Sequence, residues 1–210
     1  MDSIKTYCIS RSCDKDRRME MVRQFSKQDW PVIFYNAICP KDINGWSLKI
    51  NHDAFNNSFN RNIRPGEIGI WESNYDILQN FINENEYEYI CVFEDDTMIL
   101  QKYKYIIHLI SNNRQIDCLM HDFRFGNFIE RETNNNLLSK LEPSWTCSNA
   151  YIINKKLAKY IVDKYKNNAI CEPWDYIFPK LSMDFGFYSL KRGNEWATIN
   201  FHKNFQSNIS

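Results

Sequence analysis

Glycine and proline are scarce in this chain of 210 residues, with six of each. Neither G-x-G-x-x-G nor a Walker-type phosphate loop occurs, which disfavours the classical dinucleotide-binding and P-loop proteins. No run approaches the roughly 18 apolar residues that span a bilayer. No apolar segment follows a basic amino terminus, as it would in a signal peptide. We therefore expect a cytoplasmic protein without a transmembrane segment.

An excess of charge of either sign is missing too, because Lys plus Arg and Asp plus Glu number 26 each. This balance gives no general attraction to nucleic acid, and we expect no nucleic-acid partner. The seven cysteines lack the pair spacing of a metal site, which favours reduced thiols inside a cell. The length fits one α/β domain, and we expect residues 1–210 to form it.

The most informative stretch is the apolar run from Ile90 to Phe93, which ends in three carboxylates. The run predicts a strand buried on both faces. Because side chains alternate along a strand, we expect Glu94 and Asp96 on one side and Asp95 on the other. Two carboxylates at the carboxyl end of a buried strand are costly without a cation between them. In open α/β sheets this end is also where ligands bind.

A hard divalent cation that itself holds a diphosphate explains the acidic triplet best. The alternative is a solvated turn or the first turn of a helix, where acidic residues are also common.

The opening of the chain is a second candidate for nucleotide binding. Residues 4–10 predict a strand, and a loop leads from it into a helix that carries Arg17 and Arg18. A strand, loop and helix with basic residues can receive a nucleotide, whereas the alternative is a solvated helix face. The nucleotide-binding residues that we predict here are Ile9, Ser10, Arg11 and Arg17.

The other segments complete an α/β pattern. A helix begins near Pro65, with Glu67 in its first turn, and Ser73 lies on an early turn. The remaining predictions are a strand at 32–37, an irregular excursion at 44–62, a helix at 105–110, a strand at 116–120, a mobile loop or lid at 127–142, a strand at 150–153, a helix capped by Asn154, and strands at 187–190 and 196–201. This order predicts a mostly parallel central sheet flanked by helices, with a mixed carboxyl-terminal part.

A second pair of carboxylates, Glu172 and Asp175, is framed by two large aromatic residues, Trp174 and Tyr176. Aromatic faces stack well on sugar rings and bases, which predicts a sugar or acceptor site here. The alternative is a loop whose aromatic side chains cover the core.

Taken in order, these segments resemble glycosyltransferase family 25, which includes bacterial lipooligosaccharide β-galactosyltransferases and procollagen galactosyltransferases. The matching segments are 4–36, P-G-E-I-G at 65–69 with Ser73-Asn74, V-F-E-D-D at 92–96, S-N-A-Y-I-I-N at 148–154, Trp174-Asp175 and Q-S-N-I-S at 206–210. The chain departs from the family pattern at Ile70, Asn74 and Pro173, where the family has Cys, His and Asp.

The resemblance implies a GT-A fold in which an acidic pair binds Mn²⁺ or Mg²⁺ and the diphosphate of a UDP-sugar. It also implies inverting transfer of a hexose, galactose or glucose, to a hydroxyl of a glycan, a lipid-linked saccharide or a hydroxylated side chain. The implied metal ligands are Glu94, Asp96 and His202, and the implied donor site adds Glu67, Ser73 and Asp95. Such a reaction needs a carboxylate base, for which Asp175 is the first choice and Glu172 the second.

Two other functions stay open at this point. One is a nucleotide- or glycan-binding protein of the same fold without catalysis, because the family His and Asp are replaced. The other is a different metal enzyme, such as a phosphoesterase or nucleotidyltransferase, which needs a second cation and further carboxylates or histidines. For His202 the alternative is a surface histidine without a ligand.

Overall fold

The computed structural model describes residues 4–39, 49–121, 131–132, 137–141, 148–191 and 195–199. Its elements, in chain order, are β1 (Ile4–Ser10), α1 (Lys15–Lys27), β2 (Ile33–Asn36), α2 (His52–Phe59), α3 (Pro65–Ile82), β3 (Tyr89–Glu94), β4 (Thr97–Ile99), α4 (Tyr103–Ser111), β5 (Cys118–Met120), β6 (Arg131–Glu132), β7 (Leu138–Lys140), β8 (Ala150–Asn154), α5 (Lys155–Tyr165), the 3₁₀ helix η2 (Trp174–Tyr176), α6 (Ile177–Leu181), β9 (Phe187–Leu190) and β10 (Ala197–Ile199). Within these ranges, none of the helices is both long enough and apolar enough to cross a membrane.

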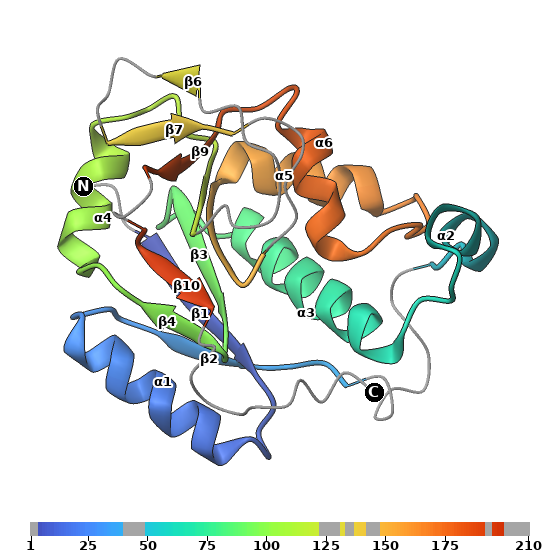
Figure 1. Ribbon diagram of the computed structural model, residues 1–210, viewed down its shortest axis with the longest axis horizontal. Coiled ribbons are helices and arrows are strands. Elements are labelled where there is room, and N and C mark those ends of the chain that lie inside the picture. Colours follow the sequence, from blue (N-terminus) through green and yellow to red (C-terminus); the bar gives the residue numbers. More distant parts are fainter. Residues whose placement is uncertain are drawn as a thin grey trace.

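The core of the molecule is an eight-stranded sheet in the order β2-β1-β3-β8-β5-β9-β7-β6 (Figure 1). Strand β1 is parallel to β2 and β3, and β5 is parallel to β9. Strand β8 is antiparallel to both β3 and β5, and β7 is antiparallel to both β9 and β6. Six of the eight strands therefore run in one direction, which confirms the expected α/β class with a mixed carboxyl-terminal part.

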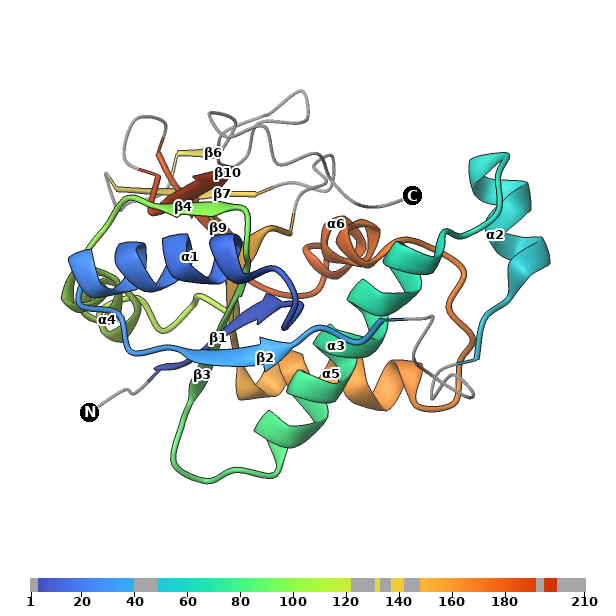
Figure 2. The ribbon, with the colours of Figure 1, turned by 90° about the horizontal axis from the view of Figure 1, so that it is seen from below.

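Side chains of the central strand β3 alternate between two hydrophobic layers. Cys91 and Phe93 belong to the layer formed with α1 and α4, whereas Ile90 and Val92 belong to the layer formed with α3 and α5. Figures 1 and 2 show these helices on the two sides of the sheet. Each of these four side chains is at most 2% exposed, as expected for a strand covered on both faces.

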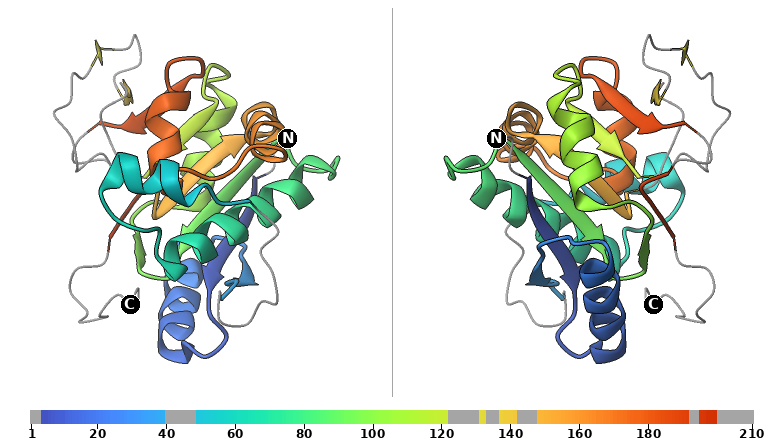
Figure 3. Two further views of the ribbon diagram at one scale, coloured as in Figure 1. Left: turned by 90° about the vertical axis from the view of Figure 1, so that its right-hand side faces the viewer. Right: turned by 90° about the vertical axis from the view of Figure 1, so that its left-hand side faces the viewer.

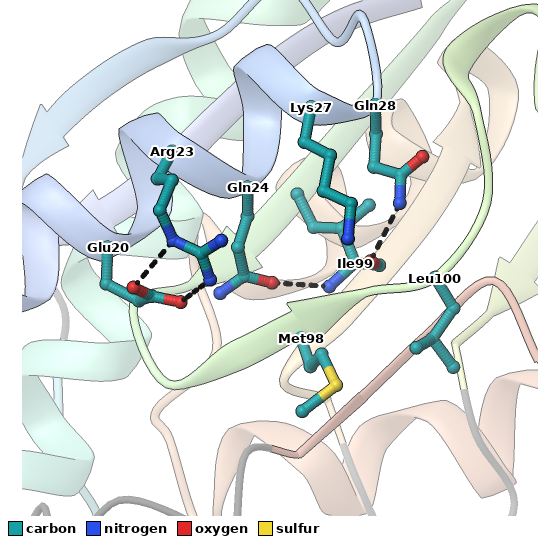
Figure 4. A pocket seen from close by; sticks show the side chains of 8 residues that line it. All are labelled: Glu20, Arg23, Gln24, Lys27, Gln28, Met98, Ile99 and Leu100. Atoms are coloured by element: carbon teal, nitrogen blue, oxygen red, sulfur yellow. Dashed lines mark hydrogen bonds and ion pairs between the residues drawn. The ribbon is translucent and has the colours of Figure 1, made fainter.

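Helix α1 closes the free edge of the short strand β4 (Figure 4). The Gln24 side chain accepts a hydrogen bond from the Ile99 backbone N–H at 2.8 Å and donates one to the Thr97 carbonyl at 3.2 Å. One buried amide thus satisfies two backbone groups that a neighbouring strand would otherwise pair. On its other edge β4 pairs with β10. These contacts fix Thr97, which directly follows the acidic triplet.

Two segments differ from the sequence-based expectation. Residues 52–59, predicted to be irregular, form α2, because the Asn51 side chain accepts from the Ala54 N–H at the helix start and Phe55 is fully buried. The predicted loop or lid at 127–142 contains β6 and β7, which join the sheet through β9. Apart from residues 137 and 141, the rest of that loop lies outside the described residues.

Gly186 occupies a position where a side chain has no room. A Cβ atom there would lie 2.1 Å from the backbone oxygen of Gln115, and the Gly186 N–H and carbonyl both bond to the segment that enters β5. We expect Gly186→Ala to lower the free energy of unfolding by about 1–3 kcal/mol, because backbone rather than a flexible side chain must move. Urea denaturation measures this loss.

Met183→Ala is the control for that measurement, since Met183 is 70% exposed and its removal should change stability by less than about 0.5 kcal/mol. Equal stability of the Gly186→Ala variant and the wild type would contradict the predicted clash.

Candidate active site

The acidic triplet lies where three strands meet at one edge of the sheet. Strand β3 ends at Glu94, which is in register with Ile9 of the parallel strand β1. The antiparallel strand β8 begins at the same edge, because Ala150 is in register with Phe93. Asn149 directly precedes β8, and its carbonyl accepts from the Glu94 N–H at 2.7 Å. The topology thus gathers residues from positions 10, 94 and 149 into one place.

The carboxylates alternate as the strand pattern predicts. The Asn149 amide donates to both Glu94 Oε2 at 3.3 Å and Asp96 Oδ1 at 3.0 Å. Asp95 faces the other way, where its carboxylate accepts from Ser10 Oγ at 2.6 Å and from Arg17 Nη1 at 2.8 Å. Glu94 and Asp96 therefore form a pair on one side of the turn, and Asp95 fastens the turn to β1 and α1.

Arg17 and Arg18 of α1 do not form a solvated helix face. The ion pair between Arg17 and Asp95 is largely buried, with side-chain exposures of 16% and 10%. Arg18 Nη2 donates to the Ser10 carbonyl at 2.6 Å. Arg11 pairs with Asp14 three residues later, at 2.7 Å. These arginines order the loop between β1 and α1, and their contact with a nucleotide stays a prediction.

The two carboxyl groups of the pair resist ionisation. Burial, followed by the charges of Asp96, Asp175 and Asp95, raises the pKa of Glu94 to about 8. Burial also raises the pKa of Asp96, against the hydrogen bond from Asn149. Two carboxylates that are both hard to ionise, side by side at the end of a buried strand, are the arrangement that a divalent cation would relieve. The donor set therefore fits Mn²⁺ or Mg²⁺, which prefer oxygen ligands.

The described part of the chain does not complete such a site on its own. Within it, no three His, Cys, Asp or Glu side chains converge on a common point. The predicted third ligand, His202, lies outside the described residues. The last described strand residue, Ile199, is in register with Thr97, the neighbour of Asp96.

Asp175 is held near this edge by the aromatic core. Its neighbour Trp174 is 2% exposed and packs against Trp71, with ring centroids 4.8 Å apart. Trp174 thus covers the core, as the alternative interpretation of this loop proposed, and does not offer a face to a sugar. Burial raises the pKa of Asp175, and the charge of Asp175 in turn contributes to the raised pKa of Glu94. The two acidic groups are therefore electrostatic neighbours.

Glu172 faces away from solvent and is already paired. Its side chain lies 2.5 Å from Lys180 Nζ and accepts a hydrogen bond from the Tyr165 hydroxyl at 3.3 Å. Its carbonyl accepts from Trp71 Nε1 at 2.7 Å. These contacts suit a residue that fastens the loop to α3 and α5, and they leave Asp175 as the better placed of the two predicted bases.

The predicted donor-site residues of α3 also have partners within the fold. Glu67 accepts two hydrogen bonds from Arg61 at 2.7 Å and one from the Arg64 N–H at 2.8 Å, which closes the first turn of the helix. The Ser73 hydroxyl donates to the Gly69 carbonyl and accepts from the Ile38 N–H, just beyond β2. Nucleotide binding by either residue stays a prediction.

One departure from the family pattern, at Asn74, falls on a buried position. Asn74 is 2% exposed; its amide donates to the Ile70 carbonyl, and its oxygen accepts from the Tyr151 hydroxyl at 2.6 Å. In this chain the position joins α3 to β8. Sequence reasoning gave no site role to Asn149, although it lies in a small polar stretch before a strand and in the matching segment 148–154.

Comparison with known proteins agrees with this geometry. Residues 3–178 match the family described as Glycosyltransferase family 25 (LPS biosynthesis protein). A putative glycosyltransferase from Haemophilus influenzae is 28% identical over 180 residues, a match that covers 78% of this chain and 58% of that protein. The chain thus spans less than two thirds of that relative.

Among solved structures, the crystal structure of A197 from STIV resembles this fold with a TM-score of 0.51 and 11% identity, over 90% of this chain and 82% of that one. A likeness at this level of identity concerns the fold alone.

Proposed function

The chain belongs to glycosyltransferase family 25, and we propose that it transfers a hexose, galactose or glucose, from a UDP-sugar to a hydroxyl acceptor with inversion at the anomeric carbon. The observation that carries the proposal is the pair formed by Glu94 and Asp96, which share the Asn149 amide at the carboxyl edge of the sheet. The family membership supports a glycosyl donor, and the acidic pair supports a donor with a diphosphate.

Glu94 and Asp96 are the residues that would hold Mn²⁺ or Mg²⁺. When bound, the cation supplies a Lewis acid that neutralises charge on the diphosphate leaving group. Asn149 orients both carboxylates, and Asp95, through Ser10 and Arg17, keeps the turn in place. Preorganised groups of this kind need no rearrangement when charge develops.

Asp175 is the proposed general base. The acceptor hydroxyl oxygen forms the new bond to the anomeric carbon, the bond from that carbon to the diphosphate breaks, and the diphosphate leaves with the electron pair. The hydroxyl proton passes to the Asp175 carboxylate. Because burial raises the pKa of Asp175, its carboxylate is a stronger proton acceptor than an exposed aspartate.

A panel of UDP-sugars with Mn²⁺ tests this function. We expect release of UDP that depends on the cation and increases with a hydroxyl acceptor. An increase in the melting temperature of the protein with UDP and Mn²⁺, without turnover, would instead favour a binding protein of the same fold. Hydrolysis of simple phosphate esters would favour a phosphoesterase, a class that needs more metal ligands than converge in the described ranges.

Cation affinity should rise with pH. Because the pKa of Glu94 is raised to about 8, this carboxyl is mostly protonated at neutral pH in the cation-free protein. In the cation-free protein, the protonated Glu94 carboxyl favours the folded state. This stabilisation is fully present below the ordinary pKa of the group and is lost as the pH rises through the raised pKa. Cation binding requires the carboxylate, so Mg²⁺ affinity should increase up to about tenfold per unit between about pH 6 and pH 8.

Calorimetric titration with Mg²⁺ measures this dependence. At neutral pH, titrations in two buffers of different ionisation enthalpy should show release of about one proton per cation. An affinity that stays constant across this range, with no proton released, would contradict the assignment of Glu94 as a ligand.

A further inference from the structure

We propose that the exposed ring of Tyr176, together with Phe59 of α2, forms the subsite that holds a pyranose ring of a saccharide acceptor. This inference rests on the proposed function and deepens it. It assigns the acceptor to one chemical class, a glycan, and not to a hydroxylated amino-acid side chain.

Tyr176 stands directly beside the proposed base. It follows Asp175 in η2, and its side chain is 41% exposed, whereas the preceding Trp174 anchors the segment in the core at 2% exposure. The proposal requires that an acceptor resting on Tyr176 place a hydroxyl group within reach of the Asp175 carboxylate.

The backbone brings α2 to the same place. Ile50 and Ile170 form a parallel bridge, in which the Asn51 N–H donates to the Ile170 carbonyl at 2.8 Å and the Ile170 N–H donates to the Lys49 carbonyl at 2.7 Å. The segment that enters α2 is thus joined to the segment that leads into η2. In the left view of Figure 3, α2 lies in front of α6, which directly follows η2.

The two rings meet edge to face. The centroids of Phe59 and Tyr176 are 5.1 Å apart, with an interplanar angle of 90°. In a perpendicular pair each ring uses at most one face, so at least one face of Tyr176 is not covered by Phe59. Phe59 is itself supported by the buried Phe55 at 4.8 Å. A partly exposed aromatic ring on a rigid support suits the apolar face of a sugar ring.

Polar groups flank these rings. The Arg61 Cζ atom lies 5.2 Å from the centroid of the Phe55 ring, and the guanidinium group forms a bidentate ion pair with Glu67. The hydrogen bond to Glu67 is the main cause of the raised pKa of Arg61, and Tyr176 adds to it. Burial is the main cause of the raised pKa of Asp175, and Glu67 adds to it. Charged groups near an aromatic ring can also form hydrogen bonds with sugar hydroxyls.

Saturation-transfer NMR tests the subsite with lactose and methyl β-D-glucopyranoside as probes, in the presence of UDP and Mg²⁺. We expect transfer to the ring protons of at least one saccharide in the wild type, and about a tenfold loss in Tyr176→Ala. Tyr176→Phe should keep the transfer, because stacking needs the ring and not the hydroxyl.

Tyr160→Ala is a matched control. Tyr160 is 40% exposed and meets Phe185 at 5.0 Å, but it lies on α5 and not beside Asp175. Its removal should leave the saccharide signals unchanged.

Wild-type protein that shows no transfer to either saccharide, or Tyr176→Ala protein with undiminished transfer, would overturn the subsite. Calorimetric titration with UDP on the same samples separates this failure from failure of the proposed function. Saccharide binding that depends on Tyr176 without UDP binding would keep the subsite and refute the transferase. UDP binding without saccharide binding would keep the proposed transferase and refute the subsite.

Discussion

Asp96→Ala should abolish cation-dependent binding of UDP and reduce sugar transfer about a thousandfold or more. The substitution leaves Glu94 as the single carboxylate on the Asn149 amide, and one carboxylate holds the cation much more weakly than two. A Lewis acid at a departing diphosphate contributes several kcal/mol to the barrier, which corresponds to this loss. Titration with UDP, with and without Mg²⁺, measures the binding, and UDP release from a UDP-sugar measures the transfer.

The fold should survive this change. Burial and neighbouring negative charge raise the pKa of Asp96, so its ionised form is unfavourable in the cation-free protein, and its removal should leave the melting temperature equal or higher. Asp163→Asn is the control, because Asp163 is 59% exposed and pairs with Lys159 at the surface of α5. Unaltered Mg²⁺-dependent UDP binding in Asp96→Ala would remove the cation role from this residue.

Asp175→Asn should lower kcat by about a hundredfold to ten-thousandfold while UDP binding stays intact. The amide keeps the size of the side chain but cannot accept the proton of the acceptor hydroxyl, and general-base catalysis contributes a factor of this order. Steady-state kinetics with a hydroxyl acceptor, together with UDP titration, distinguish a lost base from a lost donor site.

Glu172→Gln is the informative comparison. It weakens the contact with Lys180 and keeps the backbone bond from Trp71, so we expect a lower melting temperature and nearly normal kcat. If Glu172→Gln stopped transfer and Asp175→Asn did not, the role of the base would belong to Glu172.

The acidic turn could be predicted from the sequence because its signals are local. An apolar run followed by three carboxylates specifies both a buried strand and the side to which each acid points, and the contacts of Glu94, Asp95 and Asp96 confirm that alternation. The helix that Asn154 caps was predictable for the same reason, and its cap accepts from the Leu157 N–H.

Features that depend on strand pairing could not be predicted in this way. Asn149 reaches Glu94 across 55 residues, and only the antiparallel placement of β8 beside β3 brings the two together. Trp174 and Tyr176 are similar in sequence pattern, but the turn of η2 buries one and exposes the other. The asparagine-rich sequence of α2 also shows no clear apolar pattern of a helix, because Phe55 is its one buried residue.

The contact between α1 and β4 limits association of protein molecules through the edge of a strand. A strand edge with free N–H and carbonyl groups can recruit a strand from another molecule and begin aggregation. On β4 the groups that would do so are occupied by the amide of Gln24, and Gln28 donates to the Ile99 carbonyl. Two glutamine side chains therefore protect the strand next to the acidic turn from intermolecular β-sheet formation.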